Sequence, residues 1–226
     1  MTAISTQELK PKRTYDAART KEIILDAAEE IFAELGFSAA RIDAIAKAAG
    51  YNKSLIYQYY QDKLGLYTEV IIRADQLGDK MLLDINGELL KDESLTSDAV
   101  KFKQFLEKLI HGSLQFLLDH PRYLKILSWE MAEEWKTWNQ ITYLPDDATM
   151  FYELAKKAQM NGLLRADLDP KVFPSIVLNN VYSSIQSYSR FRPFLNESNS
   201  TDSIVNYKDQ VARFIIHGVM EPSALK

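Results

Sequence analysis

Hydrogen-bonding and aromatic side chains are concentrated in the segment NKSLIYQYYQDK, residues 52–63. Lys53 and Ser54 stand at the start of a short helical pattern, the end from which a groove-binding helix contacts base edges. Tyr57 and Tyr59 carry hydroxyls that can donate hydrogen bonds to phosphates. These residue types in this order suit contact with a DNA duplex rather than the making or breaking of bonds.

The residues that precede this segment provide the rest of a helix-turn-helix. An amphipathic stretch, residues 42–49, ends at Gly50, which can adopt the positive φ that terminates a helix. Asn52 is a good N-cap for a second helix, because its side chain can accept from a backbone N–H one turn later. Ile45 and Ile56 are apolar and can pack the two helices together. A packing unit without DNA contacts has the same spacing, so that alternative stays open here.

Residues 20–67 also resemble the N-terminal domain of the TetR family of bacterial transcriptional repressors. Three segments carry the resemblance, namely IILDAAEEIFAELGF at 23–37, IDAIAKAAG at 42–50 and LIYQYYQDKLGLY at 55–67. Arg41 departs from the family pattern, which usually has Thr or Ser there to cap the helix and touch a phosphate. Arg can still reach a phosphate, but it does not supply the cap.

Two kinds of DNA contact are therefore expected. Lys53 and Ser54 would contact base edges, with Gln58 as a further base reader, while Arg41 and Lys63 would hold the phosphate backbone together with the two tyrosines. The complete set of candidate DNA-binding residues is Arg41, Asn52, Lys53, Ser54, Tyr57, Gln58, Tyr59 and Lys63.

The net charge of −4 is unusual for a protein that binds DNA, but it is unevenly distributed. Residues 1–63 hold equal numbers of basic and acidic side chains, so the excess of acid lies in residues 64–226. Local rather than net charge determines phosphate contact. Residues 1–13 are expected to form a flexible basic tail, which either contacts the phosphate backbone or remains solvated.

Several functional classes are disfavoured by the sequence. The chain has no cysteine, so disulfides and thiolate sites are excluded. Its N-terminus lacks the apolar region of a secretory signal, and no apolar run approaches the roughly 18 residues of a membrane span. The three histidines lack ligand-spaced partners and no Gly-rich phosphate loop occurs. We expect a cytoplasmic protein that is not an enzyme, without a metal, a cofactor or a membrane partner.

Helical periodicity extends over almost the whole chain and predicts an all-α fold. The expected domains are a tail at 1–13, a three-helix helix-turn-helix domain at 14–62, and a larger helical effector-binding and dimerisation domain at 63–226 that a long helix joins to it. Helices are expected at about 16–35, 42–49, 52–60, 63–89, 102–120, 122–138, 146–162, 170–193 and 203–218.

The resemblance implies that the larger domain binds a small organic effector between helices. Aromatic residues gather between 129 and 152, and polar residues interrupt the apolar helix at 176–188. Such residues can line a pocket, although core packing is the commoner use of aromatics at helical spacing. The candidate ligand-binding residues are Trp129, Phe151, Tyr152, Asn179, Tyr182 and Gln186.

The resemblance further implies a homodimer built from the last long helices. Independently, one short recognition helix makes few base contacts, and two-fold symmetry doubles them on a palindromic operator. Phe191, Phe194, Phe214 and Ile215 are candidate interface residues, with burial inside one subunit as the alternative. The expected function is a ligand-responsive repressor. A helical sensor or carrier without sequence-specific DNA binding, and a non-specific DNA binder, are the other classes left open.

Overall fold

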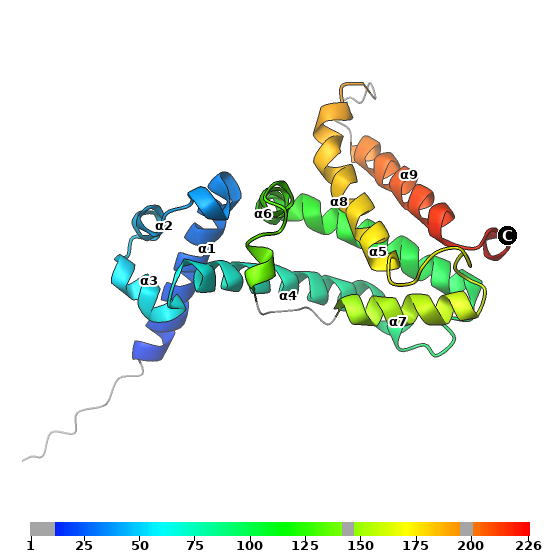
Figure 1. Ribbon diagram of the computed structural model, residues 1–226, viewed down its shortest axis with the longest axis horizontal. Coiled ribbons are helices and arrows are strands. Elements are labelled where there is room, and N and C mark those ends of the chain that lie inside the picture. Colours follow the sequence, from blue (N-terminus) through cyan, green and yellow to red (C-terminus); the bar gives the residue numbers. More distant parts are fainter. Residues whose placement is uncertain (1–11, 142–146, 195–200) are drawn as a thin grey trace, which may run out of the picture. The chain divides into compact units, whose positions relative to one another are not determined.

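A computed structural model describes residues 12–141, 147–194 and 201–226 of the 226-residue chain. The described residues fall into two compact units. Unit 1 comprises residues 12–72 and 125–141, and unit 2 comprises residues 73–124, 147–194 and 201–226. Within the described residues, the regular elements are helices, and one isolated antiparallel bridge joins Leu164 to Met220. The expected all-α fold is confirmed (Figure 1).

The helices follow the expected order with small differences at their ends. Their bounds are α1 (Lys12–Ala39), α2 (Ile42–Ala49), α3 (Lys53–Tyr60), α4 (Lys63–Leu90), α5 (Ala99–Asp119), α6 (Pro121–Ala132), η1 (Trp138–Gln140), α7 (Asp147–Met160), α8 (Phe173–Phe191), α9 (Thr201–Val219) and η2 (Pro222–Leu225). The predicted tail at 1–13 falls largely outside the described residues.

Unit 1 is built around the apolar faces of α1, α2 and α3. Helix α2 contacts both α1 and α3. Ile45 on α2 and Ile56 on α3 are fully buried, as their expected role in packing the helices requires. Tyr60, one turn after Ile56, is also buried and donates its hydroxyl to the Lys21 carbonyl of α1 at 3.1 Å. These contacts determine which face of α3 is turned away from the core.

The turn between α2 and α3 has the predicted chemistry. Gly50 ends α2 with φ 73° and ψ 24°, in the left-handed region that glycine adopts without strain. The Asn52 side chain accepts a hydrogen bond from the Leu55 N–H at 2.9 Å and so caps α3. Arg41 occupies the N-cap position of α2 without a side-chain capping bond, as expected from its side chain.

The C-terminal half of α6 packs within unit 1, an arrangement that periodicity did not reveal. Gly36, with φ 70°, interrupts α1, and a Cβ there would lie 3.0 Å from the Trp129 ring. The Trp129 indole N–H also donates to the Ala33 carbonyl at 3.2 Å. Glu130 is buried and accepts hydrogen bonds from the Tyr67 hydroxyl at 2.6 Å and the Trp138 N–H at 3.0 Å.

The helix predicted over 122–138 is therefore too long. It ends at Ala132, and Glu134 and Trp135 follow with φ near 60°, which a right-handed helix does not allow. The chain then turns back, and the Trp138 backbone N–H donates to the Glu130 carboxylate. The packing unit at the N-terminus also includes residues 63–72 and 125–141. Packing units do not define functional domains, so the predicted functional boundary at residue 63 stays a prediction.

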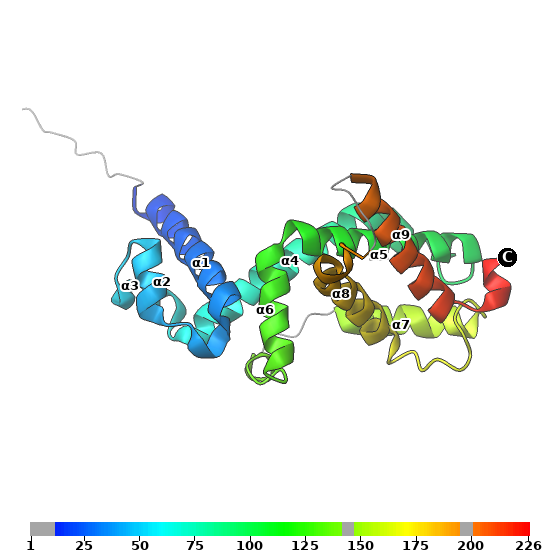
Figure 2. The same ribbon diagram turned by 90° about the horizontal axis from the view of Figure 1, so that it is seen from above.

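Unit 2 is a bundle in which α5 contacts both α8 and α9, and α8 also contacts α7 and α9. Both views show α5, α8 and α9 side by side (Figures 1 and 2). Its core consists of fully buried aromatic and aliphatic side chains, among them Phe102, Phe105, Leu106, Ile110 and Phe173. No helix in the described ranges has both the length and the hydropathy needed to cross a bilayer.

The buried bond between Tyr67 and Glu130 should stabilise unit 1. Tyr67→Phe removes a hydrogen bond to a buried carboxylate, which should lower the free energy of unfolding by about 1.5–3 kcal/mol. All three tryptophans lie in unit 1, so urea unfolding followed by tryptophan fluorescence reports on this unit. Tyr123→Phe is the matched control, because it removes a half-buried hydroxyl–carboxylate bond to Asp75 within unit 2. Equal shifts for both variants would contradict the assignment.

Candidate nucleic-acid interface

One face of α3 carries an exposed stripe of side chains that can hydrogen-bond. Lys53, Ser54, Tyr57 and Gln58 are all exposed, whereas Ile56 and Tyr60 on the opposite face are buried. Because these four positions repeat at helical spacing, they form one continuous surface. The stripe provides an ammonium, two hydroxyls and an amide, a mixture that can bind both base edges and phosphates.

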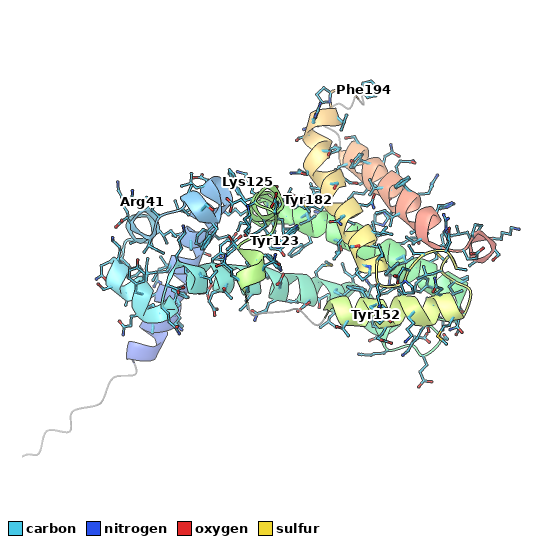
Figure 3. The ribbon with its side chains drawn as sticks, viewed as in Figure 1. Arg41, Tyr123, Lys125, Tyr152, Tyr182 and Phe194 are labelled. Atoms are coloured by element: carbon cyan, nitrogen blue, oxygen red, sulfur yellow. The ribbon has the colours of Figure 1, made fainter. Side chains whose placement is uncertain are left out.

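A charged cluster lies beside this stripe, at the first turns of α2 and α3. The Asp43 carboxylate is 2.6 Å from the Lys53 Nζ and 3.7 Å from the Arg41 guanidinium. The hydrogen bond from Lys53 holds the pKa of Asp43 below its ordinary value, so the carboxylate is charged at neutral pH. Arg41 lies at the start of α2 with its side chain 79% exposed, which leaves it accessible to a phosphate (Figure 3).

Lys63 and Tyr59 are less exposed than the stripe on α3. The Lys63 ammonium donates to the Ser38 carbonyl at 3.3 Å and lies 4.5 Å from the centre of the Phe37 ring. Burial lowers the pKa of this ammonium, although the nearby Glu133 carboxylate opposes the change. The Tyr59 ring faces the Lys21 ammonium at 5.4 Å. Both residues therefore also contribute to packing at this surface.

The eight candidate DNA-binding residues are thus all in unit 1, at the start of α2, along α3 and at the start of α4. Their roles stay predictions. Asp43 belongs to the same surface but was missed, because its partner Lys53 is ten residues away and the pairing depends on the turn between the helices. The sequence does hold a signal for this pair. A carboxylate lies in the first turn of one predicted helix, and a lysine lies in the first turn of the next.

A groove of about 250 Å³ in unit 2 is one candidate site for a small molecule. Its lining comes from α4, α5 and His120, which directly follows α5. Met81, Ile85 and Phe116 provide apolar surface, and Asp84 and His120 are among the polar residues there. Gly112 on α5 leaves the space that the side chains of Met81 and Ile85 occupy. No cluster of three or more potential metal-ligating side chains occurs in the described part of the chain.

The six candidate ligand-binding residues do not line this groove and are spread over several helices. Trp129 contacts α1 within unit 1, as described above. Figure 3 places Tyr152 on α7 and Tyr182 on α8; Tyr182 and Phe151 are buried in unit 2. Asn179 and Gln186 are on the exposed face of α8. Their role in ligand binding remains a prediction.

Asn86 on α4 is a further buried polar residue that sequence reasoning missed. It is 1% exposed, and neither polar atom of its side chain has a hydrogen-bond partner in the described part of the chain. Buried amides are normally satisfied by protein, water or ligand atoms. Its spacing of four residues from the buried Leu82 was the signal that could have identified it as an inward-facing polar group.

Comparison with known proteins agrees with the helix-turn-helix. Residues 24–70 match the model of the family described as bacterial regulatory proteins, tetR family. The HTH-type transcriptional repressor SCO4008 of Streptomyces coelicolor is 34% identical over 118 residues. That alignment covers 52% of this chain and 53% of the repressor, so it spans about half of the relative's length.

Solved structures match over nearly the whole chain. A TetR family transcription regulator from Marinobacter aquaeolei has a TM-score of 0.67 and 17% identity, covering 93% of this chain and 99% of its own. The regulator FadR from Bacillus subtilis, solved in complex with stearoyl-CoA, has a TM-score of 0.63 and 18% identity, with coverage of 87% and 98%. At these identities the likeness establishes the fold. The match of residues 24–70 identifies this part of the chain as the helix-turn-helix domain of the tetR family of bacterial regulatory proteins, and the similar protein SCO4008 is a transcriptional repressor.

Proposed function

We propose that this chain is a cytoplasmic, ligand-responsive repressor that binds a palindromic operator as a homodimer and leaves it when a small-molecule effector binds. The observation that carries the proposal is the exposed stripe on α3, whose opposite face is fixed in the core by Ile56 and Tyr60. A helix held in this way can enter a major groove with its polar side chains toward the bases.

The contacts divide between bases and backbone. Lys53 and Ser54 lie in the first turn of α3 and contact base edges, together with Gln58 one turn later. Tyr57, Tyr59 and Lys63 hold phosphates, and Arg41 extends the backbone contact from the start of α2. Asn52 contributes by capping α3 and so fixing the position of its first turn.

Exposed apolar side chains on α8, α9 and the residues after α8 support a dimer through this part of unit 2. Phe191, Phe194 and Phe214 are 50%, 84% and 72% exposed, which is unusual for such large rings. Ile215, in contrast, is 2% exposed and packs inside its own subunit, so we do not include it in the interface. A two-fold axis through this surface would present two α3 helices to half-sites about 34–36 Å apart, or a multiple of this distance.

The effector is proposed to bind unit 2. The groove between α4 and α5 is lined in part by the apolar side chains of Met81, Ile85 and Phe116. Asn86 does not line the groove, but its buried amide is a second polar group in unit 2 that a ligand or water could satisfy. The helices α4 and α6 each run from one unit into the other. An effector can change operator affinity only by as much as its own affinity differs between the DNA-bound and free forms of the protein.

Selection of duplexes from a random DNA pool tests the proposed function directly. The purified full-length chain at near-physiological salt should recover a palindromic motif, because two α3 helices related by symmetry read the same half-site twice. Sequencing of the bound fraction is the measurement. A folded, dimeric protein that recovers no motif, both alone and with added cell extract, would favour a sensor or carrier without sequence-specific DNA binding.

Two lysine variants separate base contacts from phosphate contacts. Lys53→Ala should cost about 1–3 kcal/mol on the selected operator and relax the preference at one position in each half-site. Lys63→Ala should weaken binding to every sequence and reduce the slope of log K against log salt by about one unit. Fluorescence anisotropy on operator and random duplexes measures both effects. Equal loss on both duplexes for Lys53→Ala would reassign this residue to the backbone.

The dimer surface is tested by a charged substitution in α9. Phe214→Glu should weaken self-association at least about tenfold, because it places a carboxylate in an apolar interface. Sedimentation velocity over a range of protein concentrations measures the change. Met160→Glu is the control, since Met160 on α7 is 80% exposed and outside the proposed surface. If Phe214→Glu left self-association unchanged, or weakened it no more than Met160→Glu does, the interface would lie elsewhere.

A further inference from the structure

Asp43 lies between two cations at the edge of the exposed face of α3. Its carboxylate is 2.6 Å from the Lys53 Nζ and 3.7 Å from the Arg41 guanidinium. The side chains of Arg41, Asp43 and Lys53 are 79%, 52% and 50% exposed, so a duplex that reaches α3 meets all three. Since Asp43 comes from α2 and Lys53 from α3, the ion pair spans the helix-turn-helix.

We infer that Asp43 is a specificity-determining residue that allows Lys53 to bind a base edge but opposes the binding of Lys53 to a phosphate. The inference rests on the proposed function, because it requires that the exposed face of α3 reads DNA. Asp43 acts through Lys53 and is therefore a positioning residue rather than a direct reader of bases.

The two kinds of DNA acceptor differ in charge. A base edge such as N7 or O6 of guanine is a neutral acceptor. The Lys53 ammonium has three donors, so it can donate to a base while it keeps its bond to Asp43. A phosphate within reach of the same ammonium lies within a few ångströms of the Asp43 carboxylate, and the two anions repel each other. The phosphate must then compete with Asp43 for the ammonium.

The competition affects non-specific binding most. Affinity for random sequences comes from phosphates neutralised by lysine and arginine. Asp43 reduces the charge of its cluster from two positive charges to one and occupies a donor of Lys53. A neutral side chain at this position would release Lys53, and to a lesser extent Arg41, for phosphate contacts that carry no sequence information.

Asp43→Asn is the informative variant, measured by fluorescence anisotropy on the selected operator and on a mixed-sequence duplex of equal length. Binding to the mixed-sequence duplex should tighten about two- to fivefold and its salt slope should steepen by about one unit. Operator affinity should gain less, so the ratio of the two affinities should fall. The thermal midpoint should stay within about 2 °C of wild type, because the pair is exposed.

Three further variants isolate the role of the ion pair. Glu34→Gln removes one exposed negative charge from α1 of the same unit and should change the affinity ratio little. Asp43→Glu keeps the charge and should restore the wild-type ratio. In a Lys53→Gln background, most of the effect of Asp43→Asn should disappear, because the ammonium on which it acts is absent.

The outcomes separate this inference from the proposed function. If the wild-type chain shows no preference for any sequence, the proposed function is wrong and the inference is wrong with it. A wild-type chain that prefers its operator, with a ratio that Asp43→Asn leaves unchanged, overturns the inference alone. An equal effect of Asp43→Asn with and without Lys53 also overturns it, because the charge would then act on DNA without the lysine.

Discussion

The orientation of α3 depends on the burial of Ile56 and Tyr60. These residues are one turn apart and both are buried. Tyr60 also donates a hydrogen bond to the Lys21 carbonyl of α1. Because side chains on a helix keep fixed angular positions, holding this face in the core turns the hydrogen-bonding side chains of residues 53–58 outward. The cap at Asn52 then fixes the axial position of the helix. The orientation of the proposed recognition surface therefore depends on packing at buried residues.

The core that holds α3 is larger than a three-helix domain. Tyr67 of α4 and Glu130 of α6 form a buried hydrogen bond within unit 1, and Trp129 packs on Gly36 at the end of the regular part of α1. The other ends of α4 and α6 belong to unit 2. Two continuous helices therefore link the DNA-binding core covalently to the part of the chain in which an effector is proposed to bind. This connectivity gives an effector a physical route to α3 that does not require a separate signalling contact.

The sequence predicted local features well and distant pairings poorly. Gly50 and Asn52 carry their own conformational preferences, so the turn between α2 and α3 could be read from neighbouring residues. The partnership of Glu130 with Tyr67 joins residues 63 positions apart, and no periodicity signals it. The same limit applies to Trp129, whose aromatic character suggested a ligand pocket while its packing against α1 depends on the tertiary fold. The pairing of Asp43 with Lys53 lies between these cases, because it needs only the geometry of one turn.

The balance of charge in residues 1–63 limits the ways in which this region can attract DNA. With equal numbers of basic and acidic side chains, this region does not attract DNA through its net charge. In the proposed complex, the attraction comes from a few cations around α3, and one of these, Lys53, is already paired with Asp43. If α3 reads DNA as proposed, this pairing lowers the affinity for arbitrary phosphates, and base contacts supply a larger share of the binding free energy. One α3 helix offers few of these contacts, and the proposed symmetric dimer on a palindromic site would double them.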